Sequence, residues 1–427
     1  MNINKSAIQE HNQQLEKSHI RDLNFLKDKL GEEGHNIEKV LKSIGEFQIA
    51  IPSWALGTGG TRFGRFPAGG EPGSLEEKIE DIGLLHALNR SSGAISLHIP
   101  WDIPEDPAAI RNLAKSLDIK FDAVNSNTFQ DQKNQDFSYK FGSLCHTDKR
   151  VRDQAIKHNL EVINYGEMVG SKALTVWLAD GSGFPGQFNF RKAFKNTLDS
   201  LQQIYRELPE DWNLLLEYKP YEPNFYSTVI PDWGTSHLLT NKLGNRAFCL
   251  VDLGHHLPNT NIEQIVATLM MEGKLGGFHF NDSKYGDDDL TAGSTKPYQL
   301  FLIFNELLEG MQDGISSNPV PAWMIDASHN LKDPLEDLLQ SVEAIKIAYA
   351  QALLVKRDEL EEAQQNNDPV KAQEVLQNAF RTDVRSLLAE SRRLAGACID
   401  PISYFRSNTI RQSLISKRGK STMATGL

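Results

Sequence analysis

Eight short apolar runs alternate with amphipathic segments from residue 47 to about residue 350 of this 427-residue chain. The runs are rich in residues that favour strands, and the segments between them have the apolar spacing of helices. Strands that alternate with helices predict a parallel sheet, and eight such pairs predict an α/β fold of the (β/α)8 TIM barrel type, with a doubly wound sheet as the alternative. The runs are residues 47–55, 94–99, 121–125, 173–178, 212–218, 247–253, 276–281 and 322–326.

Local signals support several of the helices. Ser74 with Glu77 forms a capping box, and Asp106 before Pro107 supplies an N-cap followed by proline at the first helical position. The chain also begins with a helical pattern that has one apolar stripe. The stripe consists of Ile20, Leu23, Leu26 and Leu30.

We expect three parts: a helical lead-in over residues 1–45, the catalytic barrel over 46–355, and a C-terminal helical extension and tail over 356–427. The start of the extension is rich in Glu, Gln and Asn, and its end is basic. We interpret it as a solvated helix followed by a loose tail. The alternative is an arm that clasps another subunit.

Composition limits the function. No apolar run approaches the roughly 18 residues of a membrane span, and the start lacks the apolar core of a signal peptide, so we expect a cytoplasmic protein without a membrane partner. A net charge of −11 argues against nucleic acid and favours a neutral small molecule. The three cysteines lack CxxC spacing, so metal ligands would have to be His and carboxylate. They are Cys145, Cys249 and Cys398.

The last four predicted strands each carry, at or near the carboxyl end, one side chain that can bind a metal ion. A barrel would bring these four to its carboxyl rim, where burying three carboxylates without a cation would cost several kcal/mol each. The pattern therefore predicts a metal site rather than ordinary strand-boundary residues. Its ligands would be Glu217, Asp252, His279 and Asp326.

A second set of ligands lies beside the first. His255 follows Asp252 by three residues, and Asp287 and Asp289 are two apart, so both aspartates can turn the same way. These residues predict a second divalent site, with Asp252 bridging the two ions. The alternative is a solvated acidic turn. Mixed oxygen and imidazole ligands suit Mn²⁺, Co²⁺, Mg²⁺ or Zn²⁺, and the excess of oxygen favours Mn²⁺.

Further candidates surround these ligands. Lys219 follows Glu217 by two residues, so it would point toward the metal and could donate to a substrate oxygen, although a salt bridge at the rim is equally compatible with its position. Aromatic side chains with one histidine near other strand ends suggest the wall of a sugar pocket, and ordinary core packing is the alternative. They are Trp54, His98, Phe129 and Trp177.

At these residues the sequence resembles the xylose-isomerase-like barrels and, within them, most closely the L-rhamnose isomerases of the broad-specificity bacterial type. Xylose isomerases proper carry an acidic residue where this chain has His279. The resemblance implies that Glu217, Asp252, His279 and Asp326 hold a structural ion, while Asp252, His255, Asp287 and Asp289 hold a catalytic ion. It also implies that Trp54, His98, Phe129, Trp177 and Lys219 line the substrate, and that Phe63 reaches into a neighbouring subunit of a homotetramer.

The expected function is metal-dependent interconversion of an aldose and its 2-ketose, L-rhamnose to L-rhamnulose with relaxed specificity, by hydride shift between C1 and C2. Lys219 would donate to the O1 side and His98 would handle the ring oxygen during ring opening. If the C2 hydrogen did not move as a hydride, Asp326 would be the suspected base that removes it as a proton. The alternatives are a ketose 3-epimerase with one metal, a nuclease of the same superfamily, which the charge disfavours, and a catalytically silent sugar-binding barrel.

Overall fold

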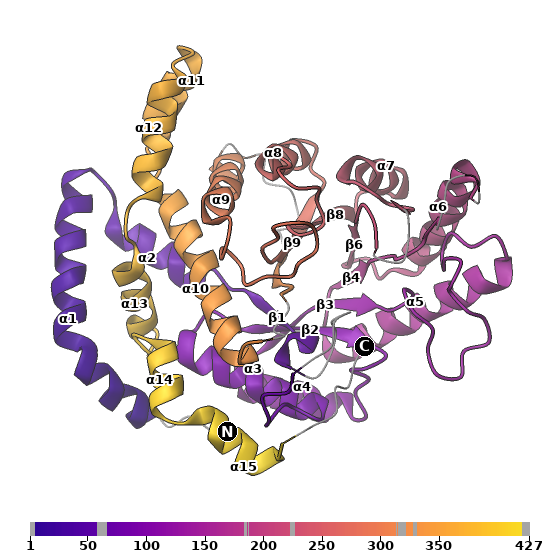
Figure 1. The fold of residues 1–427 in the computed structure, drawn as a ribbon, viewed down its shortest axis with the longest axis horizontal. Coiled ribbons are helices and arrows are strands. Elements are labelled where there is room, and N and C mark those ends of the chain that lie inside the picture. The colour runs from indigo at the N-terminus through magenta and orange to yellow at the C-terminus, as the bar shows by residue number, and fades with distance from the viewer. Residues whose placement is uncertain are drawn as a thin grey trace.

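Eight parallel strands close into a barrel in the order β1-β10-β9-β8-β6-β4-β3-β2 (Figure 1). The computed structural model describes residues 5–57, 66–182, 186, 188–222, 227–312, 314, 322–327 and 331–420. Closure confirms the predicted TIM barrel and excludes the doubly wound sheet. The strands are β1 (Ala50–Pro52), β2 (Ala94–Ile99), β3 (Lys120–Ser126), β4 (Ala173–Val176), β6 (Asn213–Glu217), β8 (Ala247–Asp252), β9 (Leu275–Phe280) and β10 (Ala322–Ile325).

Each barrel strand coincides with one of the predicted runs. The largest difference is at β1, which is much shorter than predicted because the short 3₁₀ helix η1 (Ser53–Leu56) begins directly after Pro52. A separate two-stranded antiparallel sheet pairs β5 (Gly181–Ser182) with β7 (Ser227–Thr228).

Helices surround the barrel and pack on the apolar outer faces of the strands (Figure 1). The predicted N-caps are present: Ser74 accepts a hydrogen bond from Glu77 N, and Asp106 accepts from Ala108 N and Ala109 N. The Glu77 carboxylate accepts from Gly73 N rather than from Ser74 N, so half of the capping box is as predicted. The helices are α3 (Leu75–Asn89), α4 (Pro107–Ser116), α5 (Lys149–Val169), α6 (Phe190–Glu207), α7 (Trp233–Leu243), α8 (Ile262–Met271), α9 (Pro297–Gln312) and α10 (Pro334–Leu353).

Strand order and register position the candidate ligands. Strands β6, β8, β9 and β10 are consecutive neighbours around the barrel. Asp252 is in register with His279, and His279 is in register with Met324, two residues before Asp326. Because the strands are parallel, their carboxyl ends lie at one rim, and the candidate ligands lie there.

The terminal helices cover one side of the barrel (Figure 1). In α1, three members of the predicted stripe are buried, but Ile20 is 44% exposed. Helices α11 and α12 form a hairpin that projects from the body (Figure 1). The terminal helices are α1 (Lys5–Glu32), α2 (Ile37–Glu46), α11 (Arg357–Gln365), α12 (Pro369–Phe380), α13 (Arg385–Leu394), α14 (Pro401–Ser407) and α15 (Ile410–Arg418).

The prediction of a loose tail is wrong for the chain up to residue 420. Helix α13 packs against α1 and α2, and α14 packs against α3 and α10. Arg418 in α15 forms an ion pair with Asp81 at 2.8 Å. Local sequence does not reveal an ion pair between residues so far apart in the chain. For this reason the basic end was predicted to be a solvated tail. The three cysteines are buried and unpaired.

Within the described chain, no single helix has the length and apolar character of a membrane span, and one bent pair, α10 with α11, meets those criteria by length and composition alone.

Candidate metal centre and substrate pocket

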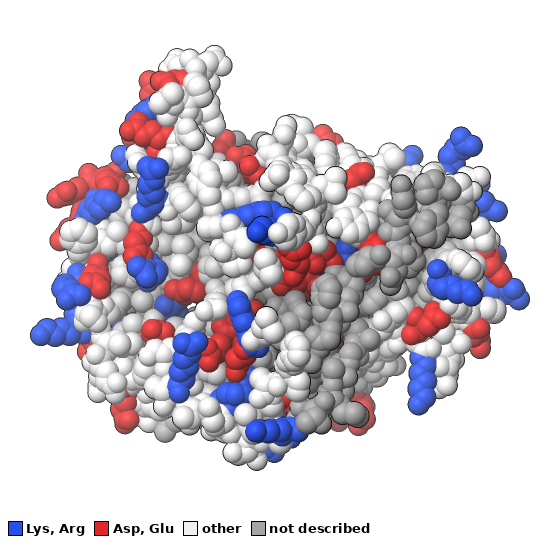
Figure 2. All heavy atoms as spheres, viewed as in Figure 1, with Lys and Arg blue, Asp and Glu red and all other residues white. Residues whose placement is uncertain are grey.

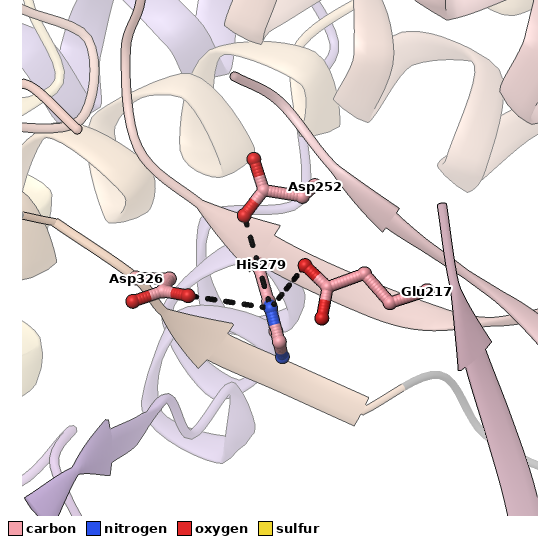
Figure 3. Close-up of side chains that lie close together, drawn as sticks. All are labelled: Glu217, Asp252, His279 and Asp326. Atoms are coloured by element: carbon pink, nitrogen blue, oxygen red, sulfur yellow. Dashed lines mark hydrogen bonds and ion pairs between the residues drawn. The ribbon is translucent and has the colours of Figure 1, made fainter. Parts of the chain in front are cut away.

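Four side chains from neighbouring strands meet at the carboxyl rim of the barrel (Figure 3). Glu217 ends β6, Asp252 ends β8, His279 lies in β9 and Asp326 follows β10. One ligand atom from each lies within 4.8 Å of the others. His279 Nδ1 is 3.2 Å from Glu217 Oε1, 3.6 Å from Asp326 Oδ2 and 3.8 Å from Asp252 Oδ2. The structure thus brings together the four ligands that the strand ends predicted.

The charges of this cluster depend on one another. Burial alone would lower the pKa of His279, but the neighbouring Glu217, with Asp326 and Asp252 adding to it, raises that pKa to about 9. Burial disfavours ionised Glu217, yet the charge and hydrogen bonding of His279 and His255 hold its pKa well below its usual value. The imidazole of His279 and the carboxylate of Glu217 therefore each stabilise the charged form of the other. Figure 2 shows acidic side chains gathered near the centre of one face of the molecule.

The carboxylates are oriented so that they can hold a cation. Asp252 Oδ1 accepts hydrogen bonds from Gly254 N at 2.7 Å and from Asn281 Nδ2 at 2.9 Å. Its Oδ2 is buried and has no hydrogen-bond partner among the described residues. Asp326 Oδ1 accepts from Trp54 Nε1 at 2.9 Å, and its Oδ2 faces His279. A divalent cation would satisfy these oxygens and replace the proton on His279, so the residues fit a metal ion.

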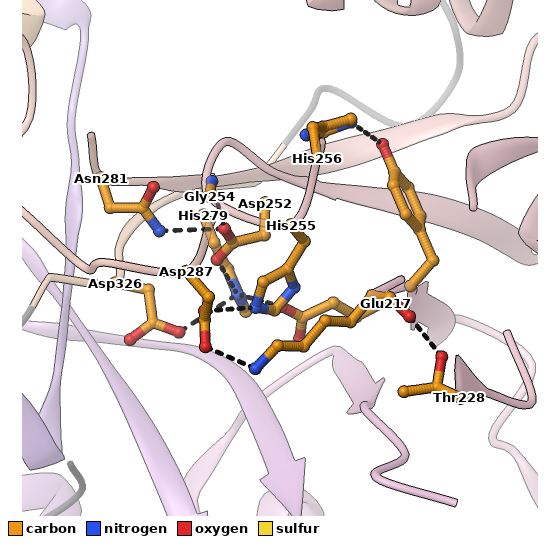
Figure 4. Close-up of polar contacts among 12 residues, drawn as sticks. Glu217, Thr228, Asp252, Gly254, His255, His256, His279, Asn281, Asp287 and Asp326 are labelled. Carbon is orange, nitrogen blue, oxygen red and sulfur yellow. Dashed lines mark hydrogen bonds and ion pairs between the residues drawn. The ribbon is translucent and has the colours of Figure 1, made fainter. Parts of the chain in front are cut away.

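The second predicted set begins beside the first (Figure 4). His255 Nε2 lies 3.0 Å from Asp287 Oδ1, and its Nδ1 lies 3.1 Å from Glu217 Oε1. In the acidic turn, Asp288 accepts from the backbone of residues 284 and 285, so it stabilises the turn itself. Asp287 and Asp289 flank it with left-handed φ angles of 55° and 49°. The structure places His255 and Asp287 together, and the role of Asp289 stays a prediction.

Lys219 is buried between two carboxylates. Its Nζ donates to Glu222 Oε2 and to Asp287 Oδ2, and it lies 5.3 Å from the ring centre of Trp177. The salt bridge that was the alternative for Lys219 is therefore present, at the edge of the predicted metal sites rather than in solvent. Glu222 was not predicted, because a carboxylate in a loop after a strand has no periodic signal.

The predicted pocket residues form one row of rings. The centroid distances are 5.0 Å from Trp54 to His98, 5.6 Å from His98 to Phe129 and 4.6 Å from Phe129 to Trp177. Trp101, which sequence reasoning missed, lies 4.8 Å from His98. Burial lowers the pKa of His98 to about 4, so its imidazole is neutral near pH 7. These rings form an apolar wall at the strand ends.

Phe63 lies outside the described residues. Asn281, which fixes Asp252, was not predicted as a site residue, although it directly follows β9. The chain position of Asn281 after a strand was the one available signal for it.

Comparison with known proteins identifies the family. The chain is 49% identical to a protein named "Probable sugar isomerase" from Mesorhizobium japonicum over 424 residues, which covers 99% of this chain and 98% of that protein. A protein of the same description from Rhizobium meliloti is 49% identical over 416 residues, covering 97% and 96%. This chain belongs to the same sugar isomerase family. No protein-family model matches the sequence.

More distant matches agree with the predicted superfamily. The xylose isomerase of Thermus thermophilus is 25% identical over 284 residues, covering 62% of this chain and 70% of that enzyme. A solved L-ribulose 3-epimerase superposes with a TM-score of 0.52 at 14% identity, covering 74% of this chain and 98% of the other. The 3-keto-D-glucoside 4-epimerase of E. coli gives 0.51 at 14% identity, with 70% and 99% covered. The structural matches show a shared barrel, and the family membership shows an isomerase-type enzyme that acts on a small-molecule sugar.

Proposed function

We propose that this protein is a metal-dependent aldose–ketose isomerase that converts L-rhamnose to L-rhamnulose and accepts related aldoses. The observation that carries the proposal is the cluster of Glu217, Asp252, His279 and Asp326 with the His255–Asp287 pair beside it. Two adjacent ligand sets suit a reaction at two neighbouring sugar oxygens. We propose two divalent ions per chain, with Mn²⁺ preferred because oxygen ligands predominate.

The proposed reaction moves the C2 hydrogen with its electron pair to C1, while a proton passes from O2 to O1. Bound divalent ions would hold O1 and O2 and stabilise the negative charge that develops there. Lys219 would donate to the O1 side, since its ammonium group already lies between Asp287 and the pocket wall at Trp177. Neutral His98 would accept or donate a proton at the ring oxygen when the sugar ring opens.

The aromatic wall supports a deoxy sugar as substrate. L-Rhamnose ends in a methyl group, and the rings of Trp54, Phe129 and Trp177 offer an apolar surface to that end of the molecule. A sugar with a hydroxyl group at the same carbon would lose a hydrogen bond to water there. A panel of aldoses that differ in configuration tests the stereochemical preference.

The second candidate function is 3-epimerisation of a ketose, which the fold of L-ribulose 3-epimerase supports at the level of architecture. That reaction needs carboxylates free to act as acid and base. At this rim, Asp252, Asp287 and Asp326 all contact other predicted ligands or Lys219, which disfavours the epimerase.

We propose that the protein is a homotetramer, which exposed side chains in the loops after barrel strands support. Three loops that follow barrel strands expose large side chains: Phe66 is 71% exposed, Tyr285 70% and Leu331 87%. Large apolar side chains exposed on several loops favour burial by another subunit. Sedimentation velocity at micromolar concentration tests this, and a monomer would contradict it.

The deciding experiment supplies Mn²⁺ to chelated protein and follows a panel of aldoses by product analysis. We expect conversion of L-rhamnose to its 2-ketose only after metal is restored. Substrate deuterated at C2 then tests the mechanism in ordinary water. Deuterium retained at C1 supports the hydride shift, and its loss to solvent at each turnover would implicate Asp326 as a base. Inversion at C3 of a ketose, with one ion per chain, would favour the epimerase.

A further inference from the structure

The C-terminal helix α15 lies against a barrel loop that is far from it in sequence. Gly70 N donates to Gly419 O at 2.9 Å, and Arg418 Nη1 donates to Gly70 O at 3.2 Å. The same Arg418 atom donates to Asp81 in α3 at 2.8 Å. The loop that follows η1 is therefore held between α15 and α3 at Gly70.

The approach of this loop to α15 requires glycine. A Cβ atom at Gly70 would lie 2.6 Å from the backbone nitrogen of Ile415, and the φ angle of Gly70 is +74°. A side chain there would force the two backbones apart and strain the loop. The contact is therefore a specific backbone-to-backbone fit rather than loose surface packing.

Arg411 joins the same loop to the first turn of α10. Its Nε and Nη2 donate to the carboxylate of Asp333 at 2.5 and 2.8 Å, and its Nη1 donates to Gly69 O at 3.1 Å. Asp333 is the N-cap of α10 and accepts from two backbone amides of that helix. An ion pair in which a guanidinium group donates two hydrogen bonds to one carboxylate is strong and directional. One side chain from α15 thus fixes the positions of two separate segments.

Both segments contact the end of η1. A Cβ at Gly57, which ends η1, would lie 2.9 Å from Glu71 Cγ and 3.1 Å from Pro334 Cγ, so the end of η1 fits between the loop and α10. Helix η1 carries Trp54, and Asp326 precedes α10 in the chain. Trp54 Nε1 donates to Asp326 Oδ1 at 2.9 Å. Helix α15 therefore holds two segments that both contact Gly57, three residues after the indole donor of this hydrogen bond.

We propose that Arg411 is a positioning residue for the metal centre: through Asp333 and Gly69 it sets the distance between η1 and the start of α10, and so the orientation of Asp326. Arg411 touches neither metal nor sugar in this assignment. The inference extends the proposed function, but Mn²⁺ affinity and amide exchange test it whether or not the protein isomerises a sugar.

Three variants of the full chain separate positioning from general stability. Arg411→Gln removes the ion pair from one side. Asp333→Asn removes it from the other and keeps a good N-cap, because asparagine caps helices as well as aspartate does. Arg406→Gln is the matched control: Arg406 also pairs with α10, through Glu336, but its side chain is 65% exposed while that of Arg411 is 10% exposed. An exposed pair contributes little.

The measurements are Mn²⁺ titration without sugar, hydrogen–deuterium exchange of the metal-free protein, and kcat and KM. We expect Arg411→Gln and Asp333→Asn each to weaken Mn²⁺ binding about tenfold, and the double variant to be no worse than either. Peptides over residues 66–73 and 331–340 should exchange faster, while β8 and β9 stay protected. Arg406→Gln should match the unmodified protein.

Other results would overturn the positioning role of Arg411 or separate it from the proposed reaction. Unchanged Mn²⁺ affinity and exchange in both variants would overturn the proposal. So would a uniform loss of protection over the barrel, or failure of both variants to fold while Arg406→Gln folds, because the pair would then be a general stability element. Faster local exchange and weaker Mn²⁺ binding in a protein that turns over no aldose would support the positioning role and contradict the proposed reaction alone.

Discussion

His255 Nδ1 lies 3.1 Å from Oε1 of Glu217, while the other ring nitrogen of His255 faces Asp287 at 3.0 Å. The Nδ1 contact has an ion-pair distance without hydrogen-bond geometry, so it acts through charge. Glu217 would therefore serve the first predicted ion as a ligand, and its charge lies beside the imidazole proposed to bind the second ion. This contact couples the two proposed sites.

The first prediction concerns the number of ions. His255→Ala should reduce the bound Mn²⁺ from two ions per chain to one and abolish turnover, since the second ion would lose its imidazole ligand. The measurement is metal analysis after equilibrium dialysis, with circular dichroism to check the fold. Asp288→Asn is the control, because Asp288 accepts backbone hydrogen bonds within the turn and asparagine can also accept them. Two ions retained in His255→Ala would contradict the second site.

The second prediction concerns stability. Restoring Mn²⁺ to chelated protein should raise the melting temperature, because a ligand present at 100 times its Kd stabilises the folded state by about 2.7 kcal/mol. Asp252→Asn should lose this gain, since Asp252 presents its unpartnered Oδ2 to the centre. Asp153→Asn, on the exposed surface of α5, should keep it. An equal shift in both variants would show that Mn²⁺ acts elsewhere on the chain.

The third prediction concerns Trp54. Trp54→Phe should weaken Mn²⁺ binding about tenfold or more while the pocket stays aromatic, because it removes the hydrogen bond that orients Asp326. Trp101→Phe changes the same aromatic row without touching Asp326 and should leave metal affinity unchanged. Titration calorimetry of both variants makes the comparison. Equal affinities would mean that Asp326 does not depend on the indole.

The barrel and its four central candidate ligands could be predicted from sequence because both depend on strands. A short apolar run that ends in Glu217, Asp252 or Asp326 carries a local signal, and barrel closure alone brings such strand ends together. That inference required the identity of the fold but not the register of the strands.

What sequence could not predict depends on the paths of loops and on long-range pairing. Glu222 and Trp101 reach the site from loops, which have no periodic pattern. The contact of Arg411 with Asp333 joins residues 78 positions apart, and nothing near either residue indicates it. The hydrogen bond from Trp54 to Asp326 likewise joins η1, which follows the first strand, to the residue that follows the last strand. Such contacts follow from the closed barrel and are visible only once it is built.

The fourth prediction concerns Lys346, a buried lysine in α10 outside the site. Its Nζ donates to Ile44 O and to Phe47 O, the latter at 2.6 Å. Burial, with the nearby charge of Arg392 adding to it, lowers the pKa of Lys346 to about 7. A neutral amine has two N–H groups, which match these two carbonyl acceptors. The folded protein therefore favours uncharged Lys346 above about pH 7.

Between pH 7 and about 10.4, the unfolded chain binds a proton at Lys346 that the folded chain does not, so this residue makes the free energy of unfolding rise with pH, by up to about 1.4 kcal/mol per unit. Lys346→Met also loses two hydrogen bonds, but that loss is constant with pH.

The urea midpoint of the unmodified protein should therefore rise relative to the midpoint of Lys346→Met as the pH increases from 7.5 to 9.5. Lys42→Met, at a side chain 74% exposed in α2, should run parallel to the unmodified protein. If the urea midpoints of Lys346→Met and the unmodified protein instead changed in parallel with pH, Lys346 would be charged in the folded chain. Its third N–H would then have a partner other than the two carbonyl groups.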